Sequence, residues 1–270
     1  MVTLHNWVQK SPLPCPDKSC KLTKTTLGLG GYVWKAISGL AKSIVLPYVQ
    51  PMKHFLPRLD ILPASQRKVW AELSGIPPEF TLYGGTAVAL HLGHRQSIDF
   101  DFFGNHPFAP LDLAASLKLL EGGAVLQSEP NTLTIVIDRG SPVKLSFFGV
   151  PRLKKIRLPH VASDNGLHVA SLLDLAGTKV TVVQQRAEAK DYIDVDAIVM
   201  DGQIDLTMAL ASAHHIYGSV FSPQNALKAL TYFDEPQLHI LPEALKQRLV
   251  KAVRAVDLDS LPKILETPAT

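Results

Sequence analysis

With 270 residues, the chain can form one large domain or two modest ones, and either can bury a substantial core. Hydrophobic residues make up 46% and charged residues 19% of the sequence, a globular composition that excludes a largely disordered chain. The net charge of +3 is too small to indicate nucleic-acid binding by the chain as a whole. Because the sequence shows neither a membrane-spanning apolar run nor a signal-peptide pattern, we expect a cytoplasmic protein with no membrane span.

Residues 1–51 differ in charge from the rest of the chain, since they carry six lysines and one aspartate. Residues 1–26 are rich in Lys, Pro, Ser and Thr without periodicity, which predicts a disordered arm. Gly28–Gln50 is more apolar and predicts a loosely amphipathic helix that could lie on a membrane surface or on a partner. We favour the simpler interpretation that residues 1–51 are a non-essential extension. Cys15 and Cys20 are interpreted as reduced thiols, because a structural zinc site needs four ligands.

Residues 63–83 predict a helix followed by a strand. Apolar side chains at helical spacing indicate a helix over residues 63–74, and two prolines separate it from the next element. Phe80–Tyr83 is a short apolar run whose aromatic residues favour a strand. We therefore expect a strand that leads directly into a pair of glycines.

Gly84, Gly85 and Thr86 follow this strand and precede a predicted helix over residues 87–92. Paired glycines let the backbone approach a ligand closely, and threonine is a good N-cap. Free N–H groups and the helix dipole at such a terminus favour negative charge. The pattern therefore predicts an anion site here, with Gly93 ending the helix.

Residues 98–102 alternate apolar and acidic side chains with a period of two. On a strand, this alternation places Asp99 and Asp101 on one face and buries the other residues on the opposite face. Two neighbouring carboxylates repel each other, and a divalent cation relieves the repulsion. Mg²⁺ is commonly held by one or two carboxylates together with substrate phosphates. We therefore predict that Asp99 and Asp101 bind Mg²⁺, or Mn²⁺ in its place.

The glycine pair and the carboxylate pair together resemble a known motif. Gly-Gly-Thr, twelve further residues and Asp-Phe-Asp are similar to the opening motif of the polymerase-β-type nucleotidyltransferase superfamily. Tyr83–Ala87 with Arg95, Ser97, Asp99 and Asp101 resembles one branch, the AbiEii-like abortive-infection family, which contains toxins of type IV toxin–antitoxin systems. The resemblance implies a nucleoside triphosphate substrate and a cognate antitoxin as partner. The simpler alternative is a glycine turn beside a surface strand whose aspartates face water.

The residues after Phe103 complete the predicted fold. They indicate a helix over 111–120 and then three short strands, at 124–127, 132–137 and 143–148. Three more helices are predicted near the end of the chain, over 204–213, 223–232 and 242–256. We therefore expect an α+β fold, with a small mixed sheet and flanking helices as the nucleotidyltransferase core at 52–160. A helical C-terminal domain would occupy 161–270.

The last predicted strand departs from the superfamily pattern, whose members often carry a third acidic metal ligand there. In this chain Lys144 and Ser146 share the corresponding strand face, and that face has no acid. Two carboxylates could suffice, or Asp138 or a distant acid could substitute. The missing acid also leaves open a catalytically inactive binding module that acts through a partner protein.

Four cations lie within six residues after this strand: Arg152, Lys154, Lys155 and Arg157. They could contact the phosphate backbone of an RNA. They could equally belong to a solvated edge strand that the charges protect from aggregation. We predict RNA contact and keep both interpretations open.

A second block of candidate site residues is predicted on two helices that begin near residue 170 and residue 190. Lys179 and Arg186 are seven residues apart and would share a helix face, and Asp191 and Asp194 face one side at spacing i, i+3. This block resembles the second conserved block of the AbiEii-like family. The resemblance implies that Lys179 contacts the nucleotide phosphates and that both aspartates support it or the transfer chemistry. The alternative is an exposed helix with salt bridges.

Together these residues predict a metal-dependent enzyme that moves a nucleoside monophosphate from a triphosphate to an acceptor and releases pyrophosphate. The glycine pair and Thr86 would hold the β- and γ-phosphates, and Lys179 would clamp the triphosphate. The AbiEii-like resemblance implies an RNA 3′ end, tRNA in some members, as the acceptor. Nucleotidylation of a protein hydroxyl is the alternative enzyme activity.

Overall fold

The computed structural model describes residues 22–27, 31–36 and 52–264, and the chain divides into two compact units at Pro51 and Met52. In the first unit, β1 (Leu22–Leu27) pairs antiparallel with β2 (Gly31–Ala36). The predicted disordered arm is therefore wrong over β1, and the predicted amphipathic helix is wrong over β2. Threonine, valine and aromatic residues favour extended backbone, and this preference prevails over a weak helical period. The other residues of both predicted segments lie outside the described residues.

A chain that begins at Met52 is expected to fold alone and to bind nucleotide as the full chain does. The reason is that both motif blocks lie in the second compact unit. Circular dichroism, thermal unfolding and nucleotide titration of the shortened and full chains would measure this. An insoluble or unfolded shortened chain would show that residues before Met52 cover core surface.

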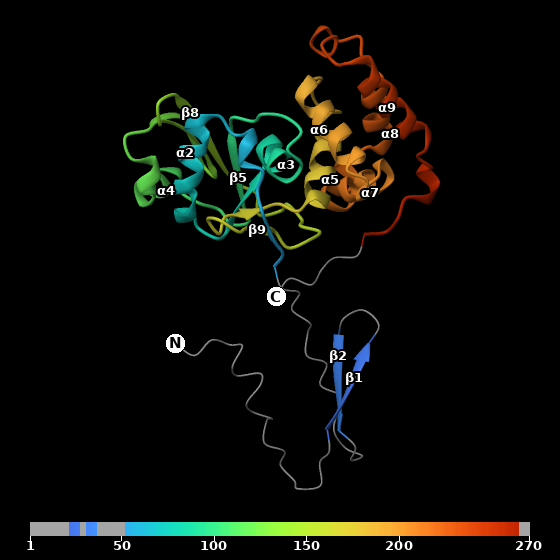
Figure 1. Cartoon of the computed structure of the whole chain (residues 1–270), viewed down its shortest axis with the longest axis horizontal. Helices are drawn as coiled ribbons and strands as arrows, with labels where there is room; N and C mark the ends of the chain where they lie inside the picture. The colour runs from blue at the N-terminus through green and yellow to red at the C-terminus, as the bar shows by residue number, and fades with distance from the viewer. Residues whose placement is uncertain (1–21, 28–30, 37–51, 265–270) are drawn as a thin grey trace. The chain divides into compact units, whose positions relative to one another are not determined.

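The second unit contains a mixed eight-stranded sheet in the order β3-β9-β10-β4-β5-β8-β7-β6 (Figure 1). Its strands are β3 (His54–Phe55), β4 (Phe80–Tyr83), β5 (Phe100–Gly104), β6 (Ala124–Glu129), β7 (Thr132–Asp138), β8 (Pro142–Gly149), β9 (His160–Ala162) and β10 (His168–Val169). Strand β5 runs antiparallel to β4 and parallel to β8. The predicted strand 80–83 and the three later ones are thus confirmed.

Helices gather in two places in Figure 1. The helices α2 (Ala64–Glu72), α3 (Gly84–Leu92) and α4 (Pro110–Ser116) accompany the sheet. The helical half consists of α5 (Leu172–Val182), α6 (Ala189–Met200), α7 (Leu206–Tyr217), α8 (Pro223–Thr231) and α9 (Glu243–Arg254). The fold is α+β, as predicted. The sheet includes β9 and β10, so the helical half begins at α5, and the predicted helix 111–120 ends early because Leu117 is extended.

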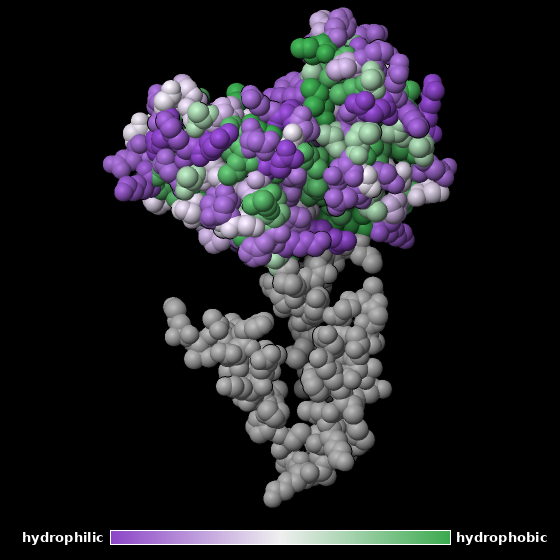
Figure 2. All heavy atoms as spheres, viewed as in Figure 1, coloured by the Kyte–Doolittle hydropathy of each residue, from purple (hydrophilic) through white to green (hydrophobic). Residues whose placement is uncertain are grey.

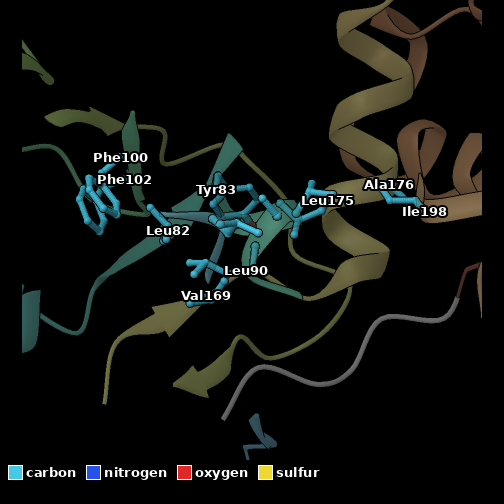
Figure 3. Close-up of a cluster of buried hydrophobic side chains, with 14 of the residues drawn as sticks. Leu82, Tyr83, Leu90, Phe100, Phe102, Val169, Leu175, Ala176 and Ile198 are labelled. Carbon is cyan, nitrogen blue, oxygen red and sulfur yellow. The ribbon is translucent and has the colours of Figure 1, made fainter. Parts of the chain in front are cut away.

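Among the described residues, a continuous hydrophobic core joins the sheet to the helical half. Phe100 and Phe102 point to the buried face of β5, as the period-two pattern predicts, and Phe102 stacks on Phe147 at 5.0 Å. Figure 3 shows the core continuing through Leu82 toward Leu175 in α5. Each large apolar side chain buried in this way stabilises the fold by about 2 kcal/mol. Only Ile98 departs from the predicted pattern among residues 98–102, since it precedes β5 and is 55% exposed.

The visible face of this unit in Figure 2 is mostly polar, and its apolar residues lie in small patches. Within the described ranges, every helix is too short or too polar to cross a bilayer.

Acid is expected to destabilise the protein through His91. This side chain of α3 stacks on Phe55 at 4.3 Å, and its Nε2 atom lies 2.9 Å from the carbonyl oxygen of Ala170. Burial lowers the pKa of His91 from 6.5 to about 4, and burial also lowers the pKa of the neighbouring His160. A histidine whose pKa is lower in the folded state binds its proton first in the unfolded state. Stability should therefore fall as the pH drops from about 6.5 to 4, by up to about 3 kcal/mol for His91.

Urea unfolding at several pH values would measure this loss. His91→Gln keeps a donor for the carbonyl and should reduce the loss, whereas His239→Gln, at an exposed position, should not. Equal acid sensitivity in both variants would mean that other groups cause the loss.

Candidate active site

A cleft of about 580 Å³ lies between the sheet and the helical half. One wall comes from the β4–α3 turn, β5 and β8, and the other from α5, α6 and α7. Six of the predicted site residues line it: Gly84, Gly85, Thr86, Asp99, Asp101 and Lys179. The structure thus brings the glycine pair, the carboxylate pair and the lysine of the second block into one cavity.

The glycine pair forms the tight turn from β4 into α3. Gly84 has φ +73°, and a Cβ atom there would lie 2.7 Å from an oxygen of Asp101. At Gly85, a Cβ would clash with the Arg95 guanidinium. Larger residues would therefore displace the functional side chains at both positions.

Thr86 is not the N-cap of α3, because the helix already begins at Gly84. Its buried hydroxyl donates to the Asp99 carbonyl oxygen and lies 2.7 Å from the Ser97 hydroxyl. Thr86 therefore ties the segment before β5 to the first turn of the helix. At the other end, Gly93 adopts φ +68° and closes α3, as predicted.

The two carboxylates lie beside polar partners on β8. Asp101 pairs across the parallel strands with Ser146, whose side chain hydrogen-bonds it. Burial and the neighbouring charge of Asp99 raise the pKa of Asp101. Asp99 lies just before β5, and its Oδ2 atom is 3.1 Å from the Nζ atom of Lys144.

This pair suits a metal that also binds phosphate. The two carboxylates are close, and their negative charges repel each other. This matches the preference of Mg²⁺ for a few protein oxygens plus substrate phosphates. Across the part of the chain that the structure describes, no cluster of three His, Cys, Asp or Glu side chains could hold a metal. Asp138 does not line the cleft, and its carboxylate accepts a hydrogen bond from the Gly140 N–H. The alternative of Asp138 as third ligand is therefore wrong.

Lys179 lies in a buried ion network. It is 5% exposed, and its Nζ atom is 2.8 Å from Asp191 Oδ1 and 2.6 Å from Asp194 Oδ2. Both carboxylates are fully buried. Arg186 also reaches Asp191, at 2.9 Å, although α5 ends at Val182 and a turn, not a shared helix face, brings it there. Asp191 and Asp194 face one side of α6, as predicted.

Asp194 connects the helical half to the loop after α3. Arg95 donates two hydrogen bonds to it, at 2.7 and 2.9 Å, and the Nε2 atom of His94 lies 2.7 Å away. Burial alone would raise the pKa of Asp194, but the bonds from His94 and Arg95 and the charge of Lys179 hold it well below the usual range. In the sequence, Arg95 stands out only as part of a motif, because no spacing pattern links residues 99 positions apart.

The four predicted RNA-contacting cations lie in the loop after β8 and do not line the cleft. Arg152, Lys154 and Arg157 are exposed. Lys155 is partly buried, with its Nζ atom 3.4 Å from the hydroxyl of Thr81. This loop is not the edge strand of the alternative interpretation.

A sheet with a glycine turn and a carboxylate pair, facing helices across a cleft, defines a nucleotidyltransferase, and the chain is an enzyme of this class. The model of the family described as "Nucleotidyl transferase AbiEii toxin, Type IV TA system" matches residues 68–265. The chain belongs to this family.

Three known proteins are similar to this chain. An uncharacterized protein of Aquifex aeolicus (strain VF5) is 30% identical over 164 residues, which cover 60% of this chain and 77% of that protein. MenT4, a nucleotidyltransferase toxin from Mycobacterium tuberculosis H37Rv, has a TM-score of 0.49 at 16% identity, over 72% of this chain and 83% of that one. A candidate nucleotidyltransferase from H. pylori has a TM-score of 0.47 at 15% identity, and the match covers 70% of this chain and 90% of that one.

Proposed function

We propose that this enzyme transfers a nucleoside monophosphate from a triphosphate to the 3′ end of an RNA, with tRNA as the first candidate. Its cellular partner would be a cognate antitoxin, as the toxin–antitoxin family implies. The observation that supports the transfer is that one cleft holds the N-terminus of α3, the carboxylate pair and the buried cation network.

The triphosphate would lie between the glycine turn and α5. The N–H groups at Gly84 and Gly85 would bind the β- and γ-phosphates, because a helix N-terminus favours negative charge. Lys179 and Arg186 both line the cleft and would face the phosphates from the helical half. Asp191 and Asp194 would act as positioning residues, since both are fully buried behind these cations.

Asp99 and Asp101 would hold Mg²⁺. When bound, the metal neutralises phosphate charge and favours in-line attack at the α-phosphorus. The backbone at Gly84 lies close to the Asp101 carboxylate, so phosphates bound by the glycine turn would also be close to Asp101. The glycine turn and the carboxylates would thus hold the reacting phosphorus between them.

The acceptor is proposed to be nucleic acid because an aromatic surface adjoins the carboxylates. Phe103 lies two residues after Asp101 on the same face of β5, opposite Phe148 of β8. The two rings meet edge to face at 5.5 Å, and both line the cleft. Bases stack on such side chains with little dependence on sequence. A peptide hydroxyl would make no comparable use of this surface.

Labelled triphosphates incubated with the protein, total RNA and cell lysate would test the acceptor. We expect label in RNA and a reaction that weakens steeply with salt. Arg152, Lys154 and Arg157, all exposed, are expected to track the phosphate backbone, so changing the three to Gln should reduce RNA labelling about tenfold without affecting triphosphate binding.

Label found only in protein would favour protein nucleotidylation. Absence of label and of triphosphate binding would favour the inactive binding module. RNA labelling that is indifferent to the triple change would place the RNA elsewhere on the surface.

A further inference from the structure

Lys144 lies where the sheet brings a cation beside the metal-binding pair. Strands β5 and β8 are parallel, with Phe100 opposite Leu145 and Asp101 opposite Ser146. Continuing this register by one residue sets Lys144 beside Asp99, and side chains at these positions point to the same face. The 3.1 Å distance from Lys144 Nζ to Asp99 Oδ2 agrees with this placement.

The ion pair of Lys144 and Asp99 is well placed to act on a ligand in the cleft. Asp99 lines the cleft, and both side chains are partly exposed, at 41% for Lys144 and 35% for Asp99. An exposed pair of this kind contributes little to stability. Burial and the charge of Asp99 raise the pKa of the neighbouring Asp101, and the charge of Lys144 opposes that rise, so the ion pair acts on the electrostatics of the site instead.

Lys144 sets the charge in direct contact with the carboxylate pair. Lys179 and Arg186 also act on Asp101 through their charges. Their own ion pairs are with Asp191 and Asp194, whereas Lys144 is paired directly with Asp99. Two carboxylates with one ammonium carry a net charge of −1, whereas an acid in place of Lys144 would give −3. A site with a charge of −1 attracts a divalent cation weakly, and two such cations much more weakly still.

We propose that Lys144 is a positioning residue whose ammonium group is the second positive charge at the carboxylate pair, beside one divalent cation. It holds Asp99 in place and limits the carboxylate pair to one divalent cation, which binds together with the triphosphate instead of before it. This inference rests on the proposed binding of metal by Asp99 and Asp101.

Titration of nucleotide-free protein with Mn²⁺, followed by electron paramagnetic resonance, tests the proposal. The wild-type chain should bind Mn²⁺ weakly, and ATP should increase the affinity. Lys144→Gln should tighten nucleotide-free binding several-fold, and Lys144→Glu by about tenfold or more, since it adds a carboxylate and removes the ammonium. Lys251→Glu, the same charge change at an exposed position on α9, should alter the affinity by less than about twofold.

The proposal would be overturned by unchanged Mn²⁺ affinity in Lys144→Gln, or by two Mn²⁺ ions bound tightly to the nucleotide-free wild type. Circular dichroism verifies folding, and Lys144→Gln carries the test if the Glu variant fails to fold. The titration needs no acceptor, so a failure of RNA transfer leaves it valid. Mn²⁺ binding that Asp101→Asn does not weaken would overturn both the metal assignment and the role of Lys144.

Discussion

Replacing Asp101 by Asn is expected to abolish nucleotidyl transfer and to leave the fold intact. Asn keeps the shape and the hydrogen bond with Ser146 but removes the charge that would hold the metal. A loss of about a thousandfold or more in kcat/KM is expected, because charge neutralisation at the α-phosphate is the main catalytic contribution in phosphoryl transfer. The same result is expected for Asp99→Asn.

Stability should be unchanged or slightly higher in this variant. Burial and Asp99 raise the pKa of Asp101, so the folded state favours its neutral form. Removing the charge relieves this penalty at neutral pH, and the gain should vanish in acid, where the carboxyl is protonated in both states. Transfer assays and thermal unfolding measure the two effects. Asp138→Asn, outside the cleft on β7, is the matched control.

Undiminished transfer by Asp101→Asn and Asp99→Asn would show that the metal site has been misplaced. Loss of activity together with unfolding would instead make the pair structural.

Unlike Asp101→Asn, the Asp194→Asn variant is expected to lose stability. Its free energy of unfolding should fall by about 3–5 kcal/mol. The fully buried carboxylate binds Arg95, His94 and Lys179, so the neutral amide would leave buried cations without their counter-charge. Since the pKa of Asp194 lies well below its usual range, the charged form stabilises the fold above the unfolded pKa of about 4. That contribution is lost only as the pH falls toward the depressed folded pKa.

Thermal unfolding should show a midpoint lower by roughly 10 °C for this variant. Activity should fall as well, because Lys179 and Arg95 lose their orientation at the cleft. Asp196→Asn is the matched control on α6, where the carboxylate pairs at 2.6 Å with Arg248, a largely exposed partner, and a smaller loss is expected. Full stability with lost activity in Asp194→Asn would argue that this carboxylate acts directly on the substrate.

The sequence alone determined the features that depend on residues close to one another along the chain. Phe80–Tyr83, the glycine pair and the alternation at residues 98–102 predicted a strand, a helix start and a second strand. The structure has all three, although the helix begins at Gly84 and Asp99 lies just before β5. A period of 2 or 3.6 is a local property, so it can be read without knowing the fold. It fails where two local preferences compete. The segment at β2 is apolar enough for an amphipathic helix but rich in residues that favour strands.

The tertiary structure alone decided which side chains meet across the chain. Nothing in the sequence pairs Arg95 with Asp194 or aligns Lys144 with Asp99, because these contacts depend on strand order and on the docking of α6. Burial likewise showed that Asp191 and Asp194 do not lie on a solvated helix face, although their spacing could equally have marked one. The neighbours of a side chain in a folded core come from distant parts of the chain. Tertiary packing therefore determines the charges around a buried residue, and a local sequence pattern cannot predict them.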